Sequence, residues 1–550
     1  MTMIAGPPPS LMASGEEALE RWSKQRRAWR PSDVTVESVI IFLIASASYM
    51  ALGSWLVLDE HVLVFDGLSR LSHAFFVFWN APPKLTAIGF VWPPIATLVF
   101  LPFAAIKPLA TSLLALPLTS AIFGALLLVM VNRVLALARM PRWQRYPLVA
   151  AFGANPMIAF YAANGMAEVL YLFFLIGAIY AFMRWYLTRA PGALIAAAVF
   201  FSLGILSRYE VFGWAVALTG SIALTSIRQR VTRAELEGTL LTYLAPIAYG
   251  VGLWLFFNWL ILGTPFFFLD QQTPGAPLSP GAVPPPSTSQ NSLSAVHVAN
   301  QLVSLNFNLF PLTAFVLGAL VVVLFQRRDL MTFSLLTMLV LNASFTWLIV
   351  LESGALSYLQ LRYNMRAMPI ALAGVAWLFL LARGRQKTLI WAAALVVLIV
   401  SVPITGRTME HFKYQFREVD FIRAVTGHGG IPDQLNGDRA LARYVSTHVR
   451  ERNSILTDDS QTFGALLISG RPDLFVDRID HGDGKWLEIL SYPWGKVTYM
   501  LVIPGGPDLA MLRYPGAADG RQPGLDPVFK AGKYVLLRVS ARPPTRRRPG

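Results

Sequence analysis

The chain has 550 residues, of which 55% are hydrophobic and 14% are charged, against about 25% charged residues in a typical soluble domain. So little charge cannot cover a soluble globule of this size. The formal net charge of +15 could indicate nucleic acid as a partner, but the basic residues form short clusters between apolar segments and no continuous stripe. The absence of cysteine excludes disulfides, thiolate metal sites and a cysteine nucleophile.

The first 38 residues carry a basic cluster ahead of the first apolar run. That run is about twenty residues long, which suits a membrane-spanning helix better than the short core of a signal peptide. Because cytoplasmic segments collect Lys and Arg, we expect residues 1–38 inside and the end of the first helix, near Leu58, outside. The cluster consists of Arg21, Lys24, Arg26, Arg27 and Arg30.

The next apolar stretch, residues 90–108, is interrupted by Pro93, Pro94 and Pro102. If this stretch and residues 112–132 both crossed the membrane, the basic cluster from Arg133 to Arg145 would lie outside, against the usual charge distribution. We therefore expect residues 59–110 to form one long external segment, with 90–108 at the membrane surface or re-entrant.

Residues 39–405 as a whole predict an α-helical polytopic membrane domain with about eleven transmembrane helices. The Pro- and Ser-rich stretch 263–308 interrupts them as a second external loop. Residues 406–550 alternate helical and strand-like patterns, which predicts a small extracytoplasmic α/β domain with a disordered tail. After the first helix, spans are expected near 112–132, 147–163, 167–186, 192–207, 211–227, 239–262, 309–326, 331–351, 367–382 and 388–405.

With this topology, the outer helix ends gather many ionisable residues. Such residues beside apolar spans are costly and suggest a function, although many near helix ends only snorkel to the interface. Three carboxylates follow the first helix, where one could act as a general base on an acceptor hydroxyl or remain a hydrated loop charge. The full set is Asp59, Glu60, Asp66, Arg70, Lys84, Glu168, Arg208, Glu210, Arg362 and Arg366.

The basic members of this set suggest an anion site. Arg362 and Arg366 run against the positive-inside trend, and arginine is well suited to bidentate binding of phosphate oxygens. Lys84, after Pro82-Pro83, is a further candidate. Lipid head groups are the alternative partners of all three residues.

Two further acidic residues lie on the same side. Glu168 begins an apolar span, so its carboxylate faces a protein interior or a watery cleft unless it snorkels. Arg208 and Glu210 flank Tyr209 between two short spans, where they could serve a substrate or form a purely structural pair.

The order of these motifs resembles the GT-C superfamily of polytopic glycosyltransferases, particularly the branch with protein mannosyltransferases and aminoarabinose transferases. In that family an acidic motif follows the first helix, and Asp59-Glu60 and Asp66 compete for the match. The later motifs, which extend the resemblance over most of the chain, are Trp92-Pro93-Pro94, Asn155-Pro156, Gly165-Met166-Ala167-Glu168, Arg208-Tyr209-Glu210, Gly263-Thr264-Pro265 and Arg362-Tyr363 ahead of Met368-Pro369.

The resemblance implies an inverting transferase that moves a sugar from a polyprenyl-phosphate donor to a lipid, glycan or protein acceptor at the outer face of the cell membrane. It implies that Asp66, or Asp59 and Glu60, activates the acceptor, and that Arg362, with Lys84 as a second candidate, holds the lipid phosphate. It requires no metal motif and no cofactor. Because the family places an aromatic residue soon after the acidic pair and Glu60 is followed by His61, the identity of the base stays open.

Two other classes of function remain open. A transporter or lipid flippase is expected to have helix breaks and buried charges at midplane depth, whereas the charges here gather at outer helix ends. A non-catalytic envelope-assembly protein would carry its function in the external domain. An assay for sugar transfer distinguishes all three classes.

Overall fold

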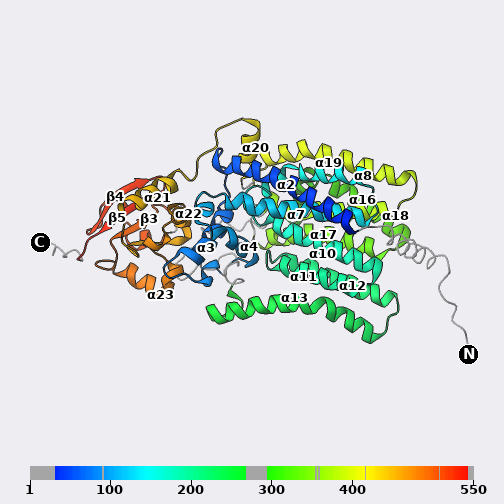
Figure 1. Cartoon of the computed structure of the whole chain (residues 1–550), viewed down its shortest axis with the longest axis horizontal. Helices are drawn as coiled ribbons and strands as arrows, with labels where there is room; N and C mark the ends of the chain where they lie inside the picture. Colours follow the sequence, from blue (N-terminus) through cyan, green and yellow to red (C-terminus); the bar gives the residue numbers. More distant parts are fainter. Residues whose placement is uncertain are drawn as a thin grey trace, which may run out of the picture.

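The computed structural model describes residues 31–89, 92–267, 294–353, 356, 359–414, 417–506 and 508–542, with the side chains of 31–35, 353, 460 and 479–483 left out. The basic cluster at the N-terminus, most of the loop 263–308 and the C-terminal tail therefore lie outside the described residues. A helical bundle forms one end of the molecule and a small domain with a sheet forms the other (Figure 1).

The bundle is built from long apolar helices. Within the described ranges, eight helical segments are long and apolar enough to cross a membrane, or up to nine if one pair bent by 107° counts as a single span. These segments are α2 (Pro31–Leu58), α7 (Ala115–Leu137), α10 (Glu168–Thr188), α12 (Val211–Arg228), α13 (Arg233–Leu262), α17 (Leu330–Ser353), η4 (Leu361–Asn364) with α18 (Ala367–Leu381), and α19 (Arg385–His411); the bent pair is α15 (Ala295–Leu309) with α16 (Leu312–Arg327).

The prediction of a polytopic helical membrane protein is confirmed, while two of the about eleven expected spans are built from shorter helices. The expected span 192–207 is α11 (Pro191–Ile205). The expected span 147–163 is divided into α8 (Arg142–Gly153) and α9 (Pro156–Tyr161). The division follows from Asn155-Pro156, because proline favours the first turn of a new helix and the Asn155 side chain accepts a hydrogen bond from the Met157 N–H.

The segment between α2 and α7 forms short helices, none of which is long enough to cross a bilayer. Its prolines start or end turns of four or five residues because proline cannot continue a helix that precedes it. In Figure 1, α3 and α4 lie between the bundle and the C-terminal domain. The elements are α3 (Phe65–Trp79), η2 (Leu85–Ile88), α4 (Ile95–Leu98), α5 (Leu101–Ala104) and α6 (Lys107–Thr111).

The C-terminal region is a small α/β domain, as predicted. Its five strands have the order β2-β1-β3-β5-β4, in which β1 is parallel to β2 and β3, and β5 is antiparallel to β3 and β4. The strands are β1 (Ile455–Thr457), β2 (Phe475–Val476), β3 (Tyr499–Val502), β4 (Leu525–Ala531) and β5 (Tyr534–Val539). The helices are α20 (Glu418–Thr426), α21 (Asn436–His448), α22 (Asp459–Ser469), η5 (Pro472–Leu474), α23 (Arg478–Ser491), α24 (Leu509–Arg513) and η6 (Ala517–Asp519).

A single hydrophobic core joins this domain to the segment after the first helix. Leu68 and Phe75 of α3 are fully buried in the same cluster as Leu466 of α22 and Leu536 of β5. The amphipathic pattern of α3 explains the contact, because one face of this helix is apolar and needs a partner. The domain is therefore packed on α3 and is not connected to the bundle by the chain alone.

A buried polar cluster joins three helices at the other end of the bundle. Glu37 of α2, Asn132 of α7 and Arg145 of α8 are all buried. Asn132 Nδ2 donates to Glu37 Oε1 at 2.7 Å, Arg145 Nη2 pairs with the same oxygen, and Arg145 Nε donates to Asn132 Oδ1 at 3.0 Å. Because each group has a partner, the cluster can remain buried between the helices.

Candidate active site

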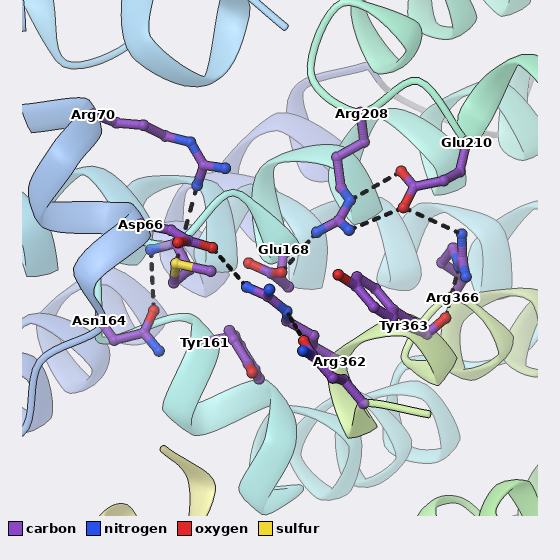
Figure 2. Close-up of polar contacts among 12 residues, drawn as sticks. Asp66, Arg70, Tyr161, Asn164, Glu168, Arg208, Glu210, Arg362, Tyr363 and Arg366 are labelled. Carbon is purple, nitrogen blue, oxygen red and sulfur yellow. Dashed lines mark hydrogen bonds and ion pairs between the residues drawn. The ribbon is translucent and has the colours of Figure 1, made fainter. Parts of the chain in front are cut away.

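An aspartate and an arginine from opposite parts of the sequence meet where α3 faces the bundle. Asp66 lies in the first turn of α3, and Arg362 lies in η4, directly before α18. Arg362 Nη1 donates to Asp66 Oδ2 at 2.9 Å, while its Nε donates to Gln360 Oε1 at 2.7 Å (Figure 2). The Asp66 side chain is 25% exposed and that of Arg362 is 10% exposed, so the pair is not fully shielded from solvent.

Two glycines allow the loop between α9 and α10 to lie close to its neighbours, α3 and α7. A Cβ at Gly67, next to Asp66, would lie 3.2 Å from the Asn164 carbonyl oxygen. Gly165 has φ +79°, and a Cβ there would lie 2.7 Å from Leu116 Cδ2. Both positions therefore favour glycine: Gly67 lets the first turn of α3 lie against the loop, and Gly165 lets the loop lie against α7.

A second ion-pair network lies beside the first. Arg208 Nη1 donates to Glu168 Oε1 at 2.7 Å, and Arg208 also forms a bidentate pair with Glu210 at 3.1 and 3.0 Å. Arg366 Nη1 lies 4.0 Å from Glu210 Oε1. The Tyr363 ring lies 5.3 Å from the guanidinium carbons of both Arg208 and Arg362, so one aromatic side chain links the two groups (Figure 2).

The combined cluster carries an excess of positive charge. It contains the four guanidinium groups of Arg70, Arg208, Arg362 and Arg366 and the three carboxylates of Asp66, Glu168 and Glu210. One positive charge is therefore left uncompensated within this set. Such an excess in a mostly buried site favours binding of an anion.

Arg70 is the member of this set with the weakest hydrogen bonds. Its side chain is buried, its Nη1 lies 4.0 Å from Met166 Sδ, and its Nε has no hydrogen-bond partner in the described part of the chain. It follows Asp66 by one turn of α3, so both side chains point to the same side of the helix (Figure 2). Sequence reasoning placed Arg70 among the outer charges but assigned it no role.

The arginines set the protonation of the two partly exposed carboxylates. Burial acts to raise the pKa of Asp66, but the positive charges of Arg362, Arg70 and Arg208 bring it below the usual value of an aspartate. Burial also acts against ionisation of Glu210, and Arg208 and Arg366 nevertheless lower its pKa to about 2. Both side chains are therefore carboxylates at neutral pH.

Three of the residues proposed from the sequence lie apart from this cluster. Asp59 is exposed at the end of α2 and Glu60 is half-buried, and neither forms an ion pair with a described residue. Lys84 lies at the start of η2, which packs near α23 of the C-terminal domain. No contact among the described residues joins these three to Arg362. The cluster therefore contains the other seven residues of the expected set: Asp66, Arg70, Glu168, Arg208, Glu210, Arg362 and Arg366.

Two residues near the cluster had not been proposed. Tyr161 of α9 donates to Glu418 Oε1 at 2.8 Å, and both side chains are fully buried. Glu418 begins α20, which follows the last membrane helix, so no sequence motif connected it with the bundle. In the part of the chain that the structure describes, no group of three or more His, Asp or Glu is arranged to hold a metal ion.

Comparisons with known proteins support the fold. The structure is similar to ArnT, an aminoarabinose transferase, from Cupriavidus metallidurans bound to undecaprenyl phosphate, with a TM-score of 0.56 and 13% identity over 94% of this chain and 100% of that chain. The same enzyme in the apo state gives a TM-score of 0.53 and 14% identity over 92% of this chain and 98% of that chain. No protein-family model matches the sequence, and no curated protein matches it either.

The chain therefore has the GT-C fold that the order of its motifs predicted. It is a multi-pass membrane protein with a small C-terminal α/β domain. At this level of identity the similarity defines the fold, and function has to be argued from the site.

Proposed function

We propose that this chain is a membrane glycosyltransferase that moves a sugar from a polyprenyl-phosphate donor to a hydroxyl of a cell-envelope acceptor. The observation that carries the proposal is the partly exposed Asp66–Arg362 pair, at 2.9 Å, inside a cluster with excess positive charge. The pair supplies the two groups that this reaction needs, a carboxylate to accept a proton and a cation to hold a phosphate. The undecaprenyl phosphate in the ArnT structure is consistent with such a donor.

In the proposed mechanism, Arg362 and Arg70 bind the phosphate of the donor. The acceptor oxygen attacks the anomeric carbon as the bond from that carbon to the phosphate oxygen breaks, and Asp66 takes the proton of the acceptor hydroxyl. The stereochemistry at the anomeric carbon is inverted because the two oxygens lie on opposite faces. Charge compensation makes the phosphate a good leaving group, so the protein has to supply positioning, a base and cations.

The ion pair between Asp66 and Arg362 links phosphate binding by Arg362 to proton transfer to Asp66. In the free protein Arg362 lowers the pKa of Asp66 in opposition to the effect of burial, which makes the carboxylate a weak base. When a phosphate takes up hydrogen bonds from Arg362, the positive charge of Arg362 stabilises the Asp66 carboxylate less, and the pKa of Asp66 rises. Donor binding thus makes Asp66 a better proton acceptor.

The ion-pair network around Arg208 supports the segment that lies beside the Asp66–Arg362 pair. Glu168 is fully buried, and its pairing with Arg208 at 2.7 Å satisfies a charge that would otherwise be costly. Arg208 in turn holds Glu210 and packs against Tyr363. We therefore assign Arg208, Glu168, Glu210 and Arg366 to positioning Tyr363 and the segment that carries Arg362.

We place the reaction at the outer face of the membrane. The site lies at the end of the bundle that carries α3 and the C-terminal domain (Figure 1). Basic residues such as Arg230, Arg328 and Arg385 lie at the helix ends expected inside, which is the usual distribution for cytoplasmic loops. The C-terminal domain is then extracytoplasmic.

The decisive experiment is Asp66→Asn, assayed with a panel of polyprenyl-phosphate sugars and envelope acceptors. The amide keeps the shape of the side chain but cannot take a proton, so transfer should fall by roughly 10² to 10⁴, while the protein still inserts and binds the donor lipid. Asp59→Asn and Glu60→Gln are the matched controls and should retain transfer, because both residues lie outside the cluster. Wild-type transfer by Asp66→Asn would overturn the assignment of the base. Lipid transport without sugar transfer by the wild-type protein would favour the transporter class instead.

A further inference from the structure

The helix that carries Asp66 is held from two sides. On one side, the first turn of α3 touches the loop between α9 and α10 through Gly67. On the other side, α3 packs on α22 of the C-terminal domain, where Leu68 and Leu466 share one buried core. Any shift of α22 is therefore transmitted to the turn that contains Asp66, because packed cores resist compression.

The contacts from the C-terminal domain fall on the residue next to Asp66. The rings of Phe65 and Phe463 meet edge to face, with 6.5 Å between centroids and an interplanar angle of 82°. Lys533 Nζ lies 5.7 Å from the centroid of the Phe65 ring and donates to the Gln461 carbonyl oxygen at 3.1 Å. Two elements of the domain, α22 and the turn before β5, thus contact the first residue of α3.

A further contact continues along the same face. Ser72 Oγ donates to the Phe463 carbonyl oxygen at 3.2 Å and to the Leu68 carbonyl oxygen at 2.9 Å. Phe463 therefore contacts α3 through its ring at Phe65 and through its backbone two turns later. These two points determine both the position and the direction of the start of α3 relative to α22.

The residue after Phe463 shows how closely α22 is confined. A Cβ at Gly464 would lie 2.5 Å from Asp438 Oδ1 and 3.2 Å from Leu68 Cδ2. Asp438 Oδ1 is itself fixed, because it accepts a hydrogen bond from the Tyr534 hydroxyl at 2.8 Å. At this position α22 packs tightly between α21 and α3, and there is no space for a methyl group.

We propose that the C-terminal domain positions the proposed base, with Phe463 as the positioning residue that sets the distance between Asp66 and Arg362. This inference rests on the proposed function. The domain contributes no group of its own to the described cluster, and it acts by fixing the first turn of α3 against the bundle. A displacement of about 1 Å in a reacting group can reduce a rate by about 10². Loss of this contact should therefore lower turnover more than it weakens substrate binding.

Two variants test the proposal in the full-length protein. Phe463→Ala removes the contact with Phe65, and Gly464→Ala places a methyl group against Asp438 Oδ1 and Leu68, so it displaces α22 relative to α3. Both should lower kcat by about tenfold to a hundredfold, with the donor KM changed by less than about threefold. The matched controls are Gly484→Ala, in α23 with no atom within 4 Å of the added methyl group, and Tyr492→Ala, whose half-exposed ring packs on Trp494 in a separate part of the domain. Both controls should keep the wild-type kcat.

The pH profile separates positioning from a loss of stability. Asp66 is faced by Arg362 from η4, by Arg70 from α3 and by Arg208 from the segment before α12. A shift of α3 that lengthens the Asp66–Arg362 pair weakens the effect of Arg362 on the pKa of Asp66, so the acid limb of kcat/KM should move to higher pH in both test variants. If these variants only lower the thermal midpoint of unfolding and keep the wild-type kcat and pH profile, the proposal is wrong. Failure of the proposed function is a different result, in which Asp66→Asn transfers sugar as fast as the wild-type protein does.

Discussion

The role of Arg362 can be tested by Arg362→Ala, compared with Arg385→Ala. In the structure Arg362 makes hydrogen bonds to Asp66 and Gln360 at 2.9 and 2.7 Å, and only 10% of its side chain is exposed. Arg385 is exposed at the start of α19, at the end of the bundle away from the site. Both variants remove one arginine, but only the first removes a charge from the cluster.

The size of the effect follows from the hydrogen bonds that the phosphate would lose. A hydrogen bond to a charged group contributes about 1.5 to 3 kcal/mol, and each 1.4 kcal/mol corresponds to about a tenfold change. Arg208 cannot replace Arg362, because its guanidinium is already bound to Glu168 and Glu210. Arg362→Ala should therefore weaken donor binding or turnover by about tenfold to a hundredfold.

The assay is a titration of the polyprenyl-phosphate sugar with both variants in the same lipid, with kcat and KM measured separately. A second readout is the pH dependence, because loss of Arg362 raises the pKa of Asp66 and moves the acid limb of kcat/KM to higher pH. Equal effects of the two substitutions in folded protein would refute the assignment of Arg362 to the phosphate.

Three further predictions concern stability and topology. Arg208→Met leaves the fully buried Glu168 without its partner and should lower the free energy of unfolding by about 3 to 5 kcal/mol; a loss below about 1 kcal/mol on denaturation in detergent would contradict a structural role. Burial raises the pKa of Asp508 from 3.8 to about 6, so the folded domain favours the protonated form; stability should fall as the pH rises from 3.8 through about 6, and Asp508→Asn should remove this slope. A reporter fused after Arg230 should be cytoplasmic and one at the C-terminus external; an external signal at Arg230 would contradict the charge-based topology.

The fold was predictable where the signal is local or repeated along the chain. Apolar length indicates the spans, and each expected span from α2 to α19 has a helical counterpart. Strand-like runs in the sequence at 454–457, 497–503 and 534–539 also match strands β1, β3 and β5. Strand β2 has only two residues, and β4 is largely exposed and contains Pro527, so neither shows the alternation of a half-buried strand.

The site was predictable only as a list of candidate residues. The sequence left the base open among the three acidic candidates after the first helix, although the amphipathic run after Asp66 favoured that residue. The path of the chain into α3 places Asp66 at Arg362, 296 residues later. The pairing of Arg208 with Glu168 as well as with Glu210 also depends on how α10 packs beside the α11–α12 turn. Such long-range partners are determined by tertiary packing, which hydrophobic periodicity does not describe.

The buried cluster of Glu37, Asn132 and Arg145 gives one arginine two successive roles. Under the proposed topology, Arg145 belongs to the basic segment between α7 and α8 that stays on the cytoplasmic side during membrane insertion. Acidic residues have little influence on the orientation chosen at insertion. Arg145 follows Glu37 by 108 residues, so the pair can form only after α2, α7 and α8 have come together. In the assembled bundle Arg145 is buried and no longer contributes to the surface charge. The positive charge that orients the nascent loop therefore exceeds the charge that the mature protein displays there.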